Sequence, residues 1–153
     1  MSPHGPFASP LAHFRCVDYL LQVRPSPTNL AALIALLQRR LPGLLGVWLF
    51  GSVARGTARP DSDLDIAVLG AVPFDAVQLF DLGLELGVLV QRDVDLVDLR
   101  RLPIVVQKEV LLGGERLAAF DTMACDVFES DAIALYVAFR DELALASGGE
   151  DRR

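Results

Sequence analysis

Histidine and lysine are almost absent from this chain of 153 residues. The two histidines, His4 and His13, both lie near the N-terminus, and Lys108 is the single lysine. Acid–base chemistry must therefore be carried by carboxylates, since histidine is the side chain that most often performs it. The formal net charge of −6 excludes the basic footprint of a protein that holds nucleic acid along an extended surface. Nucleic acid is therefore not expected as a partner.

Cysteine and long apolar runs are also scarce. Cys16 and Cys125 are too few and too far apart in the sequence for a zinc site or a disulfide framework. No segment approaches the run of about 18 apolar residues that a membrane span requires, and no charged N-terminal region leads into an apolar stretch. These absences favour a cytoplasmic protein without a membrane partner. The apolar content is nevertheless 52%, with a mean hydropathy of +0.40, and this surplus indicates contact with a partner protein.

The spacing of apolar residues and chain breakers predicts an alternation of helices and strands. Helices are expected at residues 13–23, 28–41, 75–86 and 103–112, with Thr28 and Asp75 as N-caps. Strands are expected at residues 45–50, 63–69 and 92–99, with a short extended segment at 116–118. This order indicates one α/β or α+β domain, a sheet with flanking helices.

The chain is expected to divide into four segments. Residues 1–27 form a partly disordered N-terminal extension, 28–120 the core, 121–146 a C-terminal helix, and 147–153 a disordered polar tail. One stripe of apolar residues follows helical spacing along the C-terminal helix: Phe128, Ala132, Leu135, Tyr136, Phe139 and Leu143. The stripe either packs on the core of the domain or docks a partner, and the sequence leaves both open.

Glycine, serine and three aspartates form the candidate site. Gly51 and Ser52 directly follow the apolar strand at 45–50. Asp63 and Asp65 lie two residues apart on the next strand, so they share one face while Leu64 and Ile66 take the other. The third strand repeats this pattern and places Asp95 on the matching face, whereas Asp98 has the inward parity and is the weaker candidate.

Three converging carboxylates would repel one another unless a cation lay among them. Hard carboxylate oxygens suit Mg²⁺, and two such ions about 3.5–4 Å apart stabilise an in-line phosphoryl displacement. A P-loop is excluded, because Thr57 and Ala58 stand where lysine and serine or threonine are required. An EF-hand is excluded because Ile66 replaces its glycine and Val72 its glutamate. A merely solvated acidic face explains poorly why aspartates occupy strands, where their propensity is low.

The spacing of these motifs resembles a known superfamily. Gly51-Ser52, ten residues, and then Asp63-Leu64-Asp65 look like the signature of the nucleotidyltransferases that include DNA polymerase beta and kanamycin nucleotidyltransferase. The string from Phe50 to Gly56, together with Val94 to Val97, is similar to the minimal nucleotidyltransferases, the MntA-type antitoxins of HEPN/MNT toxin–antitoxin systems. The resemblance covers about residues 28–120 and implies a polymerase beta palm-like fold, a small mixed sheet packed on helices.

The resemblance also implies a role for each site residue. Gly51 lets the backbone approach a triphosphate, Ser52 holds its β- and γ-oxygens, and Asp63 and Asp65 bind Mg²⁺. Asp95 shares a metal and takes the proton of the attacking hydroxyl. Arg55 is either a phosphate or partner contact or a solvated arginine. Lys108 could reach the nucleotide from its helix, but with Glu109 beside it an exposed ion pair is expected instead.

The function implied by the resemblance is transfer of AMP from ATP to a tyrosine hydroxyl on a cognate HEPN-domain RNase toxin, which the modification silences. A hetero-oligomer of toxin and antitoxin would follow. Two alternatives stay open at this point. One is transfer to a small molecule such as an aminoglycoside, with a separate subunit binding the acceptor, and the other is an antitoxin that blocks its toxin by binding alone.

Overall fold

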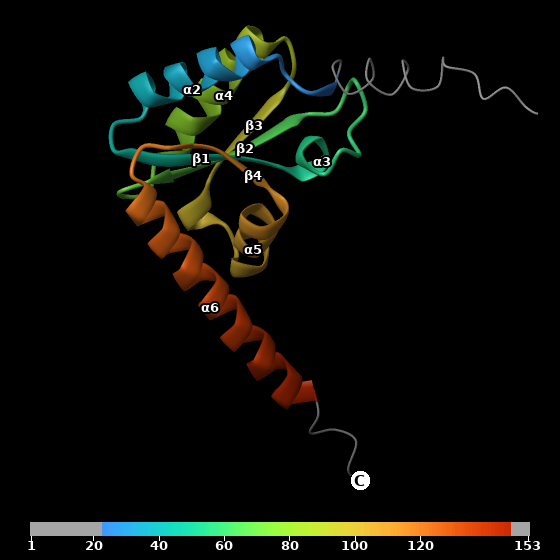
Figure 1. Ribbon diagram of the computed structural model, residues 1–153, viewed down its shortest axis with the longest axis vertical. Coiled ribbons are helices and arrows are strands. Elements are labelled where there is room, and N and C mark those ends of the chain that lie inside the picture. Colours follow the sequence, from blue (N-terminus) through green and yellow to red (C-terminus); the bar gives the residue numbers. More distant parts are fainter. Residues whose placement is uncertain (1–22, 148–153) are drawn as a thin grey trace, which may run out of the picture.

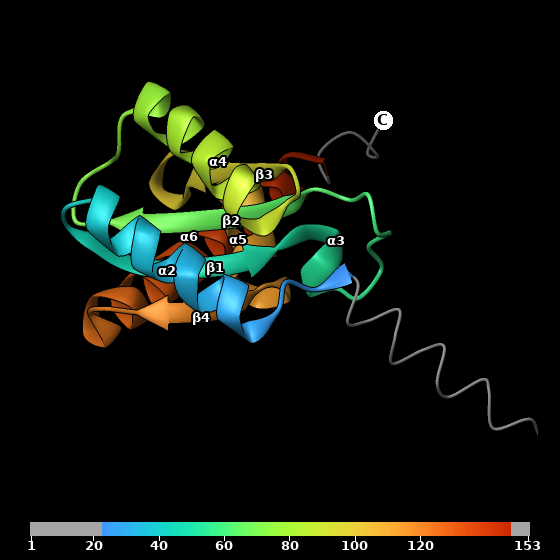
Figure 2. The same ribbon diagram turned by 90° about the horizontal axis from the view of Figure 1, so that it is seen from above.

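The computed structural model describes residues 23–147, and these residues form a four-stranded sheet with helices on both faces (Figures 1 and 2). In chain order the elements are α2 (Pro27–Arg40), β1 (Leu44–Phe50), α3 (Gly51–Ala54), β2 (Leu64–Gly70), α4 (Ala76–Val90), β3 (Val94–Asp98), the 3-10 helix η1 (Leu99–Arg101), α5 (Ile104–Gly113), β4 (Glu115–Ala119) and α6 (Thr122–Ser147). The helix expected at residues 13–23 lies outside the described residues except for Val23. The expected tail likewise lies outside them except for Ser147, which still belongs to α6.

The sheet is mixed, with the strand order β3-β2-β1-β4. β1 pairs antiparallel with both β2 and β4, while β2 and β3 are parallel. The parallel pair needs a crossover connection, and α4 supplies it. The predicted α+β class with a small mixed sheet is confirmed, and β3 and β4 are the two edges of this sheet.

The two faces of the sheet carry separate hydrophobic cores. On one face, Leu33 and Leu37 of α2 and Leu82 and Leu86 of α4 pack against the inward residues of the strands, among them Ile66. The second core lies under α5 and α6 and consists of Trp48, Ala67, Leu69, Leu99, Val110 and Cys125. The face of β2 that carries Asp65 is also part of a core further along the strand, because Ala67 and Leu69 on that face are fully buried.

Side-chain hydrogen bonds cap the N-termini of α2 and α4, the two helices on the first face of the sheet. The predicted cap of α2 was wrong, since Ser26 rather than Thr28 accepts a hydrogen bond from the Asn29 N–H, at 3.2 Å. Pro27 then occupies the first turn, where a missing N–H carries no penalty. The cap of α4 is confirmed, because one carboxylate oxygen of Asp75 accepts the N–H groups of Val77 and Gln78, each at 3.0 Å.

The stripe on α6 divides into two parts. Near the start of the helix Cys125 and Ala132 are buried, so this part packs on the second core. Further along, Leu135 is 61% exposed and Leu143 is 54% exposed, and the helix runs away from the body of the protein (Figure 1). Each of the two interpretations of the stripe therefore applies to one half of the helix, with docking by the C-terminal half still a prediction. Within residues 23–147 no helix has the length and apolar character to cross a membrane.

Candidate active site

The pairing of β1, β2 and β3 brings the predicted residues to one end of the sheet. Phe50, the last residue of β1, pairs with Asp65 of β2. Asp65 in turn pairs with Asp95 across the parallel ladder between β2 and β3. Gly51 and Ser52 begin α3 directly after Phe50, and Asp63 immediately precedes β2. Gly51, Ser52 and the carboxylates of Asp63, Asp65 and Asp95 therefore lie at the same end of the sheet.

Gly51 is required by the position of Asp65. Its φ of +69° lies in the left-handed region, which side chains other than glycine rarely adopt. A Cβ atom at this position would lie 1.9 Å from Oδ2 of Asp65, far inside van der Waals contact. The sequence analysis gave Gly51 the task of admitting a triphosphate. The structure adds that the glycine also makes room for the carboxylate on the neighbouring strand.

The segment after Ser52 folds back over the site as a loop. The carbonyl oxygen of Ser52 accepts the N–H groups of Thr57 at 3.0 Å and Ala58 at 3.1 Å. An open hollow of about 430 Å³ lies beneath the loop, and only polar and charged residues line it: Ser52, Arg59, Asp61, Ser62, Asp63 and Asp65. We call this the Ser52 hollow. Its size and polar lining are suited to a phosphate chain rather than to an apolar ligand.

Mutual repulsion and burial act on Asp65. The pKa of its carboxyl is raised, first by burial and then by the negative charges of Asp95 and Asp63, while Arg55 opposes the shift. Between residues 23 and 147, no three histidine, cysteine, aspartate or glutamate side chains already stand together as a metal site. The charges of the three aspartates therefore influence one another, but their carboxylates do not converge on a single metal position. The raised pKa nevertheless marks a position where a cation would relieve repulsion, and the oxygen donors fit Mg²⁺.

Comparison with known proteins identifies the family. A family model described as "Polymerase beta, Nucleotidyltransferase" matches residues 32–122, which include every residue of the candidate site. This chain belongs to the polymerase beta nucleotidyltransferase family. The predicted superfamily is thereby confirmed.

Relatives of the chain include a curated protein and solved complexes. Protein adenylyltransferase MntA of Shewanella oneidensis is 40% identical over 85 residues, which are 56% of this chain and 61% of that protein. The match thus spans less than two thirds of that relative. A crystal structure of a toxin–antitoxin with AMP-PNP is similar with a TM-score of 0.72 at 33% identity, over 78% of this chain and 97% of that one. An MNT antitoxin, in complex with the tri-AMPylated HEPN toxin of Shewanella oneidensis, gives a TM-score of 0.67 at 30% identity, over 79% and 95%.

Arg55 and Lys108 lie beside the site in this member of the family. Arg55 opposes the rise in the pKa of Asp65 and adds to the lowering of the pKa of Glu109 that Lys108 chiefly causes, so its charge acts on the carboxylates of the site and of α5. The predicted ion pair of Lys108 is confirmed, with Nζ 2.6 Å from a Glu109 oxygen. The ammonium also lies 5.4 Å from the centre of the Tyr136 ring on α6. Lys108 therefore links α5 to α6.

Asp98 stabilises the fold, as its position on the inward face of β3 suggested. Its side chain is only 4% exposed and accepts two backbone hydrogen bonds, from Phe74 N–H at 2.8 Å and from Arg100 N–H at 2.9 Å. The first bond fixes the turn before α4 and the second caps η1. Sequence reasoning found the inward position of Asp98 but none of its partners, which are the two backbone N–H groups and the guanidinium of Arg101, whose Nε lies 3.7 Å from Oδ2.

We expect Asp98→Asn to lower the free energy of unfolding by about 1–3 kcal/mol, because one of the two buried N–H groups would face an amide NH₂ instead of an oxygen. Nucleotidyl transfer measured well below the unfolding temperature should stay near the wild-type rate, since Asp98 points to the face opposite Asp95. Urea unfolding and an activity assay on the same preparation test both halves. Loss of activity in a folded variant would contradict this assignment.

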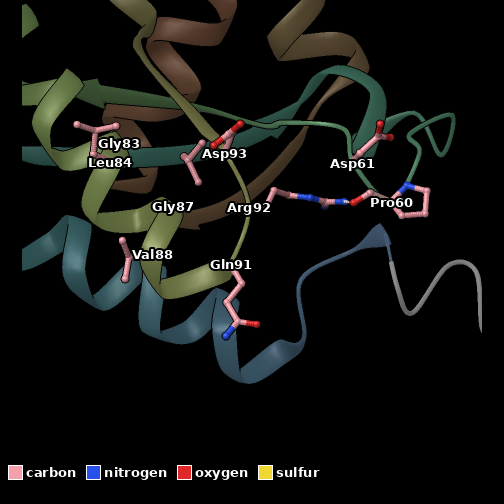
Figure 3. A pocket seen from close by; sticks show the side chains of 10 residues that line it. Pro60, Asp61, Gly83, Leu84, Gly87, Val88, Gln91, Arg92 and Asp93 are labelled. Carbon is pink, nitrogen blue, oxygen red and sulfur yellow. Dashed lines mark hydrogen bonds between the residues drawn. The ribbon is translucent and has the colours of Figure 1, made fainter.

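Arg92 is a residue that the sequence analysis missed. Its guanidinium donates to the carbonyl oxygen of Pro60 at 3.0 Å and also to that of Val23, and Figure 3 shows the side chain reaching toward Pro60. Arg92 therefore holds the loop that leads into Asp61 and Asp63. No sequence pattern reveals these bonds, because all three acceptors, which include the carbonyl of Arg59 at 3.4 Å, are backbone groups distant along the chain.

Proposed function

We propose that this protein transfers AMP from ATP to a hydroxyl group of a partner protein, with Mg²⁺ held by Asp63, Asp65 and Asp95. The observation that carries the proposal is the register of the strands, which aligns Phe50 and Gly51, Asp65 and Asp95 at one end of the sheet. Family membership supports the reaction class. Bound Mg²⁺ would neutralise the carboxylates and the developing charge on the phosphates.

The protein's own residues divide the work of the reaction. The polar lining of the Ser52 hollow suits the β- and γ-phosphates, with the hydroxyl of Ser52 as a donor. The acceptor oxygen forms a bond to the α-phosphorus, and the bond from that phosphorus to the bridging oxygen of pyrophosphate breaks. Pyrophosphate leaves with the bonding electron pair. Asp95, which is exposed, takes the proton from the acceptor hydroxyl and passes it to solvent.

The partner that we propose is a cognate HEPN-domain RNase toxin, modified on a tyrosine and thereby silenced. Supporting this, one related structure holds a tri-AMPylated HEPN toxin with its antitoxin, and a curated relative is an adenylyltransferase. The C-terminal half of α6 carries an exposed apolar surface that includes Leu135, Phe139 and Leu145. We assign this surface to docking of the same toxin.

A transfer assay tests the proposed function. Wild-type protein, Mg²⁺, ATP labelled at the α-phosphate, and the proposed HEPN-domain toxin should give label on a tyrosine of that toxin. EDTA should stop the transfer, and so should Asp63→Asn, while Asp98→Asn serves as the matched aspartate control. Label that goes to an aminoglycoside and not to the toxin would support a small-molecule acceptor. Neutralisation of the toxin by Asp63→Asn at the wild-type level would instead show inhibition by binding alone.

A further inference from the structure

A second hollow adjoins the candidate active site on the side away from Ser52. It measures about 380 Å³, lies between α4 and β3, and includes Asp63 and Asp95 in its lining together with Phe80 and Leu84. A larger hollow of about 740 Å³ continues it toward Gln91 and shares Gly83, Leu84, Asp93 and Val94 with it (Figure 3). We call the two together the α4–β3 trough. Since β3 is an edge strand, the trough lies along the edge of the sheet.

Two glycines of α4 form the floor of the trough. A Cβ atom at Gly83 would lie 3.1 Å from the carbonyl oxygen of Val94, and one at Gly87 would lie 3.1 Å from that of Arg92. Both distances are tighter than ordinary contact, so a side chain at either position would push α4 away from β3. Helix α4 therefore lies directly against the start of β3. The larger side chains of α4 next to these glycines form one side of the trough, which we call its wall.

That wall is apolar and does not pack on the protein's own core. Phe80 is 66% exposed, Leu84 59% and Val88 83%, and their spacing of four residues places them on one face of the helix. The charged residues of the remaining lining are Asp61, Asp63, Asp93 and Asp95, together with Arg92, whose guanidinium donates to the carbonyl oxygens of Pro60 and Val23. An apolar wall beside a rim of carboxylates is complementary to a segment that carries apolar anchors next to basic residues.

The trough and the Ser52 hollow meet at Asp63, which lines both. In an in-line displacement, the attacking oxygen and the leaving oxygen lie on opposite sides of the reacting phosphorus. With pyrophosphate leaving on the Ser52 side, the attacking hydroxyl has to arrive from the side of Asp95. The trough is the described hollow that opens on that side.

We propose that the α4–β3 trough receives the acceptor segment of the partner protein, with apolar residues against Phe80, Leu84 and Val88 and its hydroxyl beside Asp95. The proposal rests on the proposed function, and it adds the route by which the acceptor enters and the type of sequence that fits. Asp61 and Asp93, the lining carboxylates that are not assigned to Mg²⁺, disfavour an acceptor segment rich in acidic residues.

The first test is kinetic, with the double variant Phe80→Ser/Leu84→Ser. Both side chains are largely exposed, so the fold should be retained, and an unchanged unfolding temperature confirms it. We expect KM for the proposed HEPN-domain toxin to rise at least about tenfold, which corresponds to the loss of about 1.4 kcal/mol of binding. The Kd of AMP-PNP with Mg²⁺ should change less than about twofold. A control variant, Val72→Ser/Met123→Ser, removes similarly exposed apolar side chains near the other end of the sheet and should behave as wild type.

The second test does not depend on turnover. A photo-crosslinking amino acid placed at Val88 should form a covalent product with the purified toxin in the presence of AMP-PNP and Mg²⁺, while the same group at Met123 should form none. Weakened binding of AMP-PNP in the double variant would assign the wall to the nucleotide base and overturn the proposal. An absent crosslink from Val88, or an unchanged KM, would overturn it as well. Failure of the wild type to transfer label would instead overturn the proposed function, and the crosslink would still decide the occupant of the trough.

Discussion

Replacing Asp65 by asparagine should abolish AMP transfer and yet leave the folded protein at least as stable as the wild type. Asp65 has a raised pKa because burial and the charges of Asp95 and Asp63 disfavour its ionised form. Its ionised carboxylate therefore destabilises the fold, and a neutral amide of the same shape removes that repulsion. Loss of an outer-shell partner of a metal costs about 10- to 100-fold in affinity or activity, so loss of a direct ligand should reduce transfer more than about a hundredfold.

The sign of the pH dependence supports the same test. A carboxyl whose pKa is higher in the folded than in the unfolded state contributes stability that is present below its unfolded pKa. This contribution is lost as the pH rises through the folded pKa. Without Mg²⁺, wild-type stability relative to Asp65→Asn should therefore fall as the pH rises across the acidic range. Thermal unfolding of both proteins at several pH values measures this difference.

Addition of Mg²⁺ should reverse the order of stability. A ligand that binds only the folded state raises the unfolding temperature, so Mg²⁺ should stabilise the wild type and have little effect on Asp65→Asn. Asp98→Asn is the matched control, because it removes a carboxylate from the other face of β3 and should keep its response to Mg²⁺. An Asp65→Asn protein that still transfers AMP, or that unfolds at a lower temperature than the metal-free wild type, would contradict the assigned role.

The candidate site could be predicted from the sequence because its geometry depends on short-range rules. Alternation along a strand places Asp63 and Asp65 on one face, and the same rule separates Asp95 from Asp98. The Gly51-Ser52 turn is likewise a local feature at the end of an apolar strand. The ligands of these residues do not follow from such local rules, so the roles of the residues are proposals.

Other features could not be predicted because they depend on contacts between distant parts of the chain. Trp48 and Ala67 are buried only because α5 and α6 return to cover the second face of the sheet. The hydrogen bond from Arg92 to Pro60 joins positions 32 residues apart through a backbone carbonyl. The error at Ser26 is different in kind, since Ser26 and Thr28 are both good caps and Pro27 between them shifts the start of the helix.

Replacing Gly51 by alanine should damage stability and activity together, in contrast to Asp65→Asn. The left-handed backbone at this position (φ +69°) costs a residue with a Cβ about 1–3 kcal/mol. The new Cβ would in addition lie 1.9 Å from the Asp65 carboxylate, and overpacking of this kind typically costs a further 1–3 kcal/mol or so. We expect Gly51→Ala to lose about 2–6 kcal/mol of unfolding free energy by these two terms together. It should also lose most of its transfer activity, because Asp65 would have to move.

Gly56→Ala separates the two terms. Gly56 has a φ of +72°, but a Cβ there would meet nothing within 4 Å. Gly56→Ala should therefore lose only the part of the unfolding free energy that comes from the left-handed backbone, and it should retain its transfer activity. Urea unfolding of both variants measures the difference, which we assign to the clash with Asp65.

A double-mutant cycle then tests that assignment directly. Asp65→Ala removes the carboxylate oxygen that the new Cβ would strike, so Gly51→Ala/Asp65→Ala should be more stable than the sum of the single changes predicts. Coupling of about 1 kcal/mol or more is expected for groups in direct contact. Additive free energies would mean that Gly51 is needed only for its backbone conformation, and the steric link between the glycine turn and the carboxylate would be lost. Coupling of the expected sign would show that the Asp65 carboxylate is what excludes a side chain at position 51.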